Sequence, residues 1–216
     1  MAYLAFNCKL FLLMSKVFTR LLLVVYVASA LVLSCNQKPN NPIVTAITGI
    51  NPLDTNAADV DFFPVTNYIK GQVYEIKNSH INPLMITNDG FKKDSVWIKM
   101  EEVDQAIATF LDPLIDSTNL KAEFKQTSFK DATLNKITFA YTPTIMHPVG
   151  SPLKSWNVYI DPQTNEVSSI YILKITSGKG TEHLNWIAGK KCTIQLLKDD
   201  MMVYQRSIIW NFDKND

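Results

Sequence analysis

The chain has 216 residues, and its 21 Lys and Arg side chains nearly balance 20 Asp and Glu, for a formal net charge of +1 at pH 7. This balance excludes the strong basic excess of a nucleic-acid-binding surface. A hydrophobic share of 47% excludes an intrinsically disordered body, and the length suits one domain with a sizeable core.

An uninterrupted run of 13 apolar or small residues, LLLVVYVASALVL, occupies positions 21–33. A membrane-spanning helix needs roughly 20 such residues, whereas the apolar part of a signal peptide has about 7–15 and follows positive charge. Lys16 and Arg20 supply that charge. The pattern predicts a signal peptide over residues 1–34, with Met14 as an alternative start. One long span starting at residue 10 is the competing interpretation, but it would place both charges at bilayer depth.

The run ends in Val32-Leu33-Ser34-Cys35, which resembles the lipobox of bacterial lipoproteins. Val32 stands where Leu is usual, and Leu33 where a smaller residue is usual. The resemblance covers the first 35 residues only. It implies cleavage between Ser34 and Cys35, with acyl chains on Cys35 as the membrane anchor. Asn36 is not the Asp of inner-membrane retention and no acidic run follows, so an outer-membrane anchor facing the periplasm is expected.

The other two cysteines are Cys8, which cleavage would remove, and Cys192. A plain thiol at Cys35, after an ordinary secretory signal, could pair with Cys192. With Cys35 acylated, Cys192 is left as a small apolar residue of a strand. After cleavage, 18 basic and 20 acidic residues remain. The polar, Pro-broken residues that begin positions 35–61 indicate a flexible tether.

Two helices are expected at the start of a single domain over residues 62–216. In residues 62–78, Val65, Ile69, Val73 and Ile76 recur at helical spacing. A second helix begins with Glu101 and Glu102, where the helix dipole favours acids, and turns Val103, Ile107, Phe110 and Leu114 to one side. It ends at Asp112-Pro113, because a residue before proline avoids the helical region.

Short strands are expected between the helices, at 83–88 and 95–98, around an Asn88-Asp89-Gly90 turn. From about residue 120 the apolar period becomes two. The predicted strands there are 122–127, 135–142, 156–161, 166–175, 182–186, 191–197 and 202–212. Short connections favour an antiparallel meander. The expected fold class is therefore α+β, with two N-terminal helices packed on one face of a curved meander of about six or seven strands.

No sequence motif for catalysis or metal binding stands out. The three histidines lie in different segments and do not have the spacing of metal ligands; they are His80, His147 and His183. His147 is interpreted as a surface residue of its loop. Glu182 and His183 are expected on opposite faces of a strand. Helix-start chemistry explains Glu101-Glu102, and a turn explains Asp199-Asp200. No catalytic residue, metal ligand or cofactor is therefore predicted, and the ligand-binding residues are unknown.

The four tryptophans, Trp97, Trp156, Trp186 and Trp210, are interpreted as core residues before sugar- or peptide-stacking residues. The expected function is a non-enzymatic binding or structural role in the cell envelope, for a lipoprotein whose partners are the membrane and an envelope protein. One alternative is a carrier that encloses a hydrophobic ligand in a cavity lined by Val158, Ile170 and Trp210. A second alternative is an envelope hydrolase. No nucleic-acid partner is expected.

Overall fold

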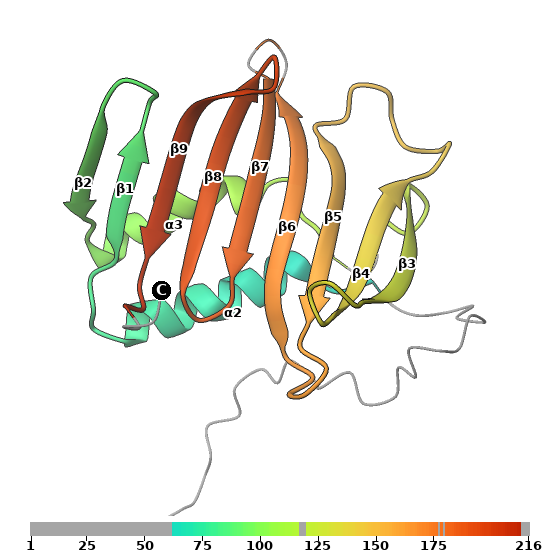
Figure 1. Ribbon diagram of the computed structural model, residues 1–216, viewed down its shortest axis with the longest axis horizontal. Coiled ribbons are helices and arrows are strands. Elements are labelled where there is room, and N and C mark those ends of the chain that lie inside the picture. The colour runs from blue at the N-terminus through green and yellow to red at the C-terminus, as the bar shows by residue number, and fades with distance from the viewer. Residues whose placement is uncertain (1–61, 117–119, 177, 179, 213–216) are drawn as a thin grey trace, which may run out of the picture. The chain divides into compact units, whose positions relative to one another are not determined.

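A computed structural model describes residues 62–116, 120–176, 178 and 180–212 (Figure 1). The expected signal peptide over 1–34 and tether over 35–61, with Ser34 and Cys35, lie outside these residues. No helix in the described part of the chain has the length and hydropathy that crossing a bilayer requires.

Nine strands of the described residues form one antiparallel sheet, in the order β2-β1-β9-β8-β7-β6-β5-β4-β3. From β3 onward each strand pairs with the next in sequence, so this part is a meander. The strands are β1 Leu84–Asn88, β2 Lys93–Trp97, β3 Phe124–Asp131, β4 Lys136–Pro143, β5 Leu153–Ile160, β6 Val167–Thr176, β7 Gly180–Ile187, β8 Lys191–Lys198 and β9 Met201–Ile209.

The expected α+β class with six or seven strands is wrong, because the sheet is larger and dominates the domain. The two short strands expected around the Asn88-Asp89-Gly90 turn do pair with each other, as β1 and β2, but they also join the larger sheet. There β1 pairs with β9, and Met85 lies opposite Ile208. This pairing joins residues more than 100 positions apart. Nothing in the sequence of either strand indicates so distant a partner.

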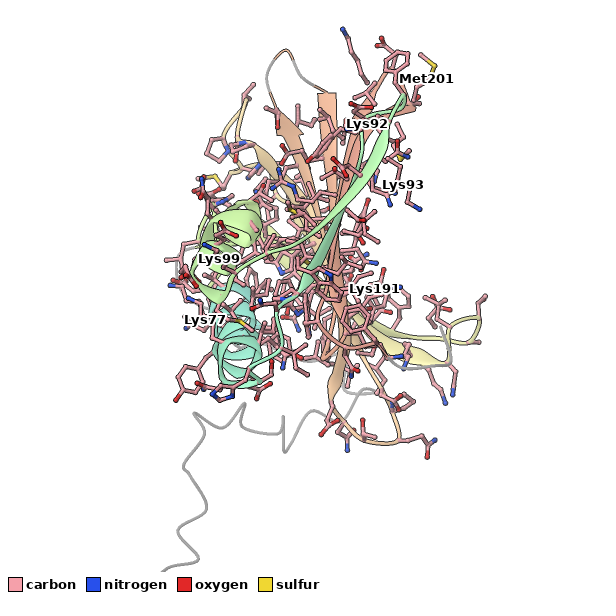
Figure 2. All side chains as sticks on the ribbon, turned by 90° about the vertical axis from the view of Figure 1, so that its left-hand side faces the viewer. Lys77, Lys92, Lys93, Lys99, Lys191 and Met201 are labelled. Atoms are coloured by element: carbon pink, nitrogen blue, oxygen red, sulfur yellow. The ribbon has the colours of Figure 1, made fainter. Side chains whose placement is uncertain are left out.

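The first helix forms as the spacing predicts. It is α2, Val65–Asn78, and it buries Val65, Ile69, Val73 and Ile76 against the sheet. Figure 2 shows the helical segments on one side of the sheet, seen edge-on. An ion pair between Lys77 and Asp104 links α2 to the second helical segment.

The predicted second helix is not continuous, and the prediction that Leu114 lies on its buried face is wrong. It consists of a 3-10 turn η1, Met100–Glu102, a short α3, Val103–Ile107, and a second 3-10 turn η2, Ala108–Phe110. Val103, Ile107 and Phe110 are buried, but Leu114 is 44% exposed. The reason lies in β6, where the buried Lys174 ammonium donates to the carbonyls of Thr109 and Asp112. A side-chain cation thus satisfies backbone acceptors that a further helical turn would have used.

The core fills the space between the helices and one face of the sheet. A register row from β4 to β9 supplies much of it: Phe139, Val158, Ile170, Trp186, Cys192 and Ile208. Trp156 stacks on Tyr141 with ring centroids 4.6 Å apart, and Trp186 packs on Trp210 at 5.0 Å. Three tryptophans therefore belong to the core, as expected. Trp97 does not: it is exposed on β2 beside Phe212.

Candidate functional site

The histidines do not come together. His80 follows α2 in a left-handed backbone conformation and is exposed. The side chain of His147 is only 8% exposed, and its Nδ1 lies 3.2 Å from Oε2 of Glu123. The interpretation of His147 as a surface residue is therefore wrong, because its ring packs on Phe124 beneath its own loop. Among the described residues, no group of three His, Cys, Asp or Glu side chains could hold a metal ion.

Glu182 and His183 lie on opposite faces of β7, as predicted. Glu182 faces the helices, where its carboxylate accepts a hydrogen bond from Thr109 Oγ1 at 3.2 Å. His183 lies on the outer face, and its Nδ1 is 2.6 Å from the Tyr171 hydroxyl oxygen. The two side chains therefore belong to different environments and do not form an acid–base pair.

The outer face of the sheet, turned away from the helices, carries two rows of half-buried polar side chains. One row crosses β5 to β9, and the other crosses β7 to β9 beside it. They contain Asn157, Tyr171, Asn185, Thr193 and Ser207 in the first row, and His183, Gln195 and Gln205 in the second. Neither row contains Asp, Glu, Lys or Arg. An antiparallel sheet commonly buries one face and turns a polar face to solvent, and here these two rows of the outer face are uncharged.

Hydrogen bonds between neighbouring strands order much of this surface. Gln195 Nε2 donates to Gln205 Oε1 at 2.9 Å, and the Thr193 and Ser207 hydroxyls are 3.3 Å apart. Within β5, Asn157 Nδ2 donates to the Tyr159 hydroxyl at 3.2 Å. The side chains are thus held in place before any ligand arrives, which reduces the entropy lost on binding.

A pocket of about 330 Å³ opens on this face over β4 to β7. This volume is near the lower end of the range for small-molecule sites. Its walls are Leu134, Lys136, Tyr159, Ser168, Ser169, Tyr171 and Asn185. The pocket therefore combines two aromatic rings with hydroxyl and amide groups, and it has one cation.

The polar groups of the pocket differ in whether they are already used. Lys136 Nζ is held by Asp161 at 2.8 Å, and the Ser168 hydroxyl donates to the Tyr159 carbonyl at 3.0 Å. By contrast, the Asn185 amide and the Ser169 hydroxyl make no side-chain hydrogen bond within the described residues. These half-buried groups are open to hydrogen bonds from a polar ligand, which would replace the water that they meet now.

Burial raises the pKa of the Tyr171 phenol, and the nearby Tyr159 raises it further. Tyr171 is therefore neutral at physiological pH, and its hydroxyl already pairs with Nδ1 of His183. With Lys136 paired, the pocket presents a surface without net charge. Its chemistry is that of recognition through hydrogen bonds and ring contacts.

The residues expected to line a carrier's cavity lie elsewhere. Val158 and Ile170 face each other on neighbouring strands of the helix-covered face and are fully buried. Trp210 packs on Trp186. These three side chains fill the core, whereas the pocket lies on the opposite face.

Sequence reasoning did not identify the pocket residues. A signal was present, because Tyr159 alternates with the core residues of β5, and Ser169 and Tyr171 alternate with those of β6. Such alternation assigns side chains to the outer face but does not say which strands are neighbours in space. Comparison of the chain with protein-family models, curated proteins and solved structures found no match.

Proposed function

We propose that this chain is a cell-envelope lipoprotein, anchored through acylated Cys35 in the outer membrane and facing the periplasm. The folded domain acts by binding and not by catalysis. Support for the anchor comes from the apolar run over 21–33 and the Ser34-Cys35 junction that follows it. Stable anchoring needs more than one acyl chain, which a multiply acylated cysteine provides.

One observation carries the proposal of a binding role: the pocket without net charge on the outer face, in which the Asn185 and Ser169 side chains make no hydrogen bond to other described residues. Ligands that match this surface have hydroxyl or amide groups and no strong charge, as in a neutral glycan or an extended peptide. The rings of Tyr159 and Tyr171 offer apolar contact area beside those hydrogen-bonding groups.

The anchor is tested by replacing Cys35. In a Gram-negative host, the mass of the N-terminal peptide of wild-type chain should include acyl groups, and the protein should fractionate with membranes. Cys35→Ser should abolish both, whereas Cys8→Ser, upstream of the predicted cleavage point, should change neither. An acylated or membrane-retained Cys35→Ser protein would overturn the anchor.

The binding role is tested on the pocket itself by titration calorimetry. The probes are neutral oligosaccharides and short uncharged peptides. We expect at least one probe to bind the wild-type chain and to lose about tenfold in affinity with Asn185→Leu, the worth of one or two hydrogen bonds. Gln195→Leu, on the same face but outside the pocket, should bind as wild type. Equal affinity of Asn185→Leu and wild type, or no binding by any probe, would reject this pocket as the site.

A further inference from the structure

Apart from Tyr74 on α2, the most exposed apolar side chains among the described residues lie in or next to three loops. Phe91 is 101% exposed in the β1–β2 turn, while Ile145 and Val149 in the β4–β5 loop are 100% and 106% exposed. Met146 in the same loop and Met201 at the start of β9 are 68% and 67% exposed. We call these five residues the apolar rim. Three of the five share the β4–β5 loop, and apolar side chains clustered at this level of exposure mark an interaction site.

The three loops close the same end of the sheet, the upper end in Figure 1. Backbone contacts tie them to that end. Ile175 N at the end of β6 donates to the Pro152 carbonyl at 2.8 Å, next to the β4–β5 loop. At the other side of the sheet, a Cβ on Gly90 would lie 4.0 Å from the Val203 carbonyl oxygen, so the β1–β2 turn lies against β9.

Internal hydrogen bonds hold the loops in shape. Asp89 Oδ1 accepts from the backbone N–H groups of Phe91 at 3.0 Å and Lys92 at 2.7 Å. In the β4–β5 loop, the Thr144 hydroxyl accepts from Met146 N at 3.1 Å and donates to the Ala122 carbonyl at 2.9 Å. These loops satisfy their own polar groups, and their apolar side chains point into solvent.

The spacing of the rim favours a lipid bilayer over a protein as its partner. The β1–β2 turn and the β4–β5 loop are separated by five strand intervals, about 24 Å at 4.8 Å each. A folded partner would need matching hollows at both places, whereas fluid acyl chains accept separate protrusions wherever they enter. We propose that the apolar rim inserts into the surface of the bilayer to which the chain is anchored.

The point where the chain enters the domain lies within reach of this end of the sheet. Phe62 packs on Tyr141 with ring centroids 5.0 Å apart, and Tyr141 lies opposite Trp156 in a row of paired residues that crosses the middle of the sheet. The 26 residues between Cys35 and Phe62 span about 28 Å if they form the flexible tether that their composition predicts. The proximity to the bilayer rests on the proposed anchor at Cys35, but the exposure of the rim does not.

Charge does not drive this contact. Lys92 and Lys93 follow Phe91 where the β1–β2 turn leads into β2, and their long side chains can reach the lipid headgroups. Asp89, Asp199 and Asp200 occupy the adjacent turns and offset them. The free energy of insertion comes from the transfer of apolar side chains out of water. The contact should therefore persist at high salt.

The experiment places a fluorescent thiol label at Val149→Cys, in the full chain produced in a Gram-negative host and reconstituted into phosphatidylcholine vesicles. Part of the lipid carries bromine near the top of its acyl chains and quenches a label that enters them. Leu134→Cys, in the exposed β3–β4 turn at the opposite end of the sheet, is the matched control. The parent chain measures background, and buried Cys192, whose pKa is raised to about 12 by burial, should stay unlabelled.

We expect about twofold or greater quenching at position 149 relative to 134, unchanged by about 0.5 M salt, at which charge contacts are screened. Equal quenching at the two positions would overturn the proposal, and so would quenching at 149 that high salt removes. The mass of the N-terminal peptide of the same sample reports acylation of Cys35 independently. Quenching at position 149 without acylation of Cys35 would reject the proposed anchor but support insertion of the apolar rim. Acylation of Cys35 without quenching at position 149 would support the anchor but overturn insertion of the rim.

Discussion

Tyr141 holds the entry of the chain onto the sheet, and Tyr141→Phe should weaken that contact in a way that depends on pH. Its hydroxyl accepts a hydrogen bond from the buried Phe63 N–H at 3.1 Å. Removing the oxygen keeps the ring that stacks on Trp156 but leaves the N–H without an acceptor. An unsatisfied buried donor costs about 1–3 kcal/mol, so Tyr141→Phe should lose that much stability at pH 8.

Burial raises the pKa of the Tyr141 phenol from 10.0 to about 12 in the folded protein. The folded state therefore keeps this proton where the unfolded chain loses it. The stability linked to Tyr141 is fully present below pH 10 and is lost as pH rises toward 12. At pH 11 the wild-type protein has lost about 1.4 kcal/mol through this group, and Tyr141→Phe has not.

The gap in unfolding free energy between wild type and Tyr141→Phe should therefore shrink by about 1.4 kcal/mol between pH 8 and pH 11. Urea unfolding followed by tryptophan fluorescence measures both proteins at each pH. Tyr68 and Cys192, whose pKa values burial also raises to about 12, lower the stability of both proteins alike and cancel in the difference. A gap that stays constant or widens with pH would refute the buried, hydrogen-bonded placement of Tyr141.

Two further substitutions test features on which the sheet depends. Gly180→Ala should destabilise the protein by about 1–3 kcal/mol, because Gly180 has φ +114° and a Cβ there would lie 2.0 Å from the Leu197 carbonyl oxygen. Gly178→Ala, which meets nothing within 4 Å, should cost less in the same thermal unfolding experiment. Lys174→Met should lower stability by about 1–3 kcal/mol and speed amide exchange in residues 108–112, because it leaves the carbonyls of Thr109 and Asp112 without their donor. Unchanged exchange there would show that Lys174 does not hold this segment.

Features that depend on a few neighbouring residues could be predicted from the sequence. The buried face of α2 follows from helical spacing, and the β8–β9 turn follows from Asp199-Asp200, both of which adopt positive φ. Alternation of apolar residues located each strand of the sheet to within a few residues. Burial on one side of a helix or strand repeats along the chain, so the pattern is visible without knowledge of its partner.

Only the tertiary structure decided which distant segments meet. The pairing of β1 with β9, the break in the second helix at Lys174, and the pocket built from β4 to β7 all join residues far apart in sequence. The apolar rim likewise gathers residues from three loops that are separated along the chain by the strands between them. Composition and residue spacing indicate which secondary structure each segment favours by itself. The choice among possible partners depends on register and packing across the whole sheet, which no local pattern encodes.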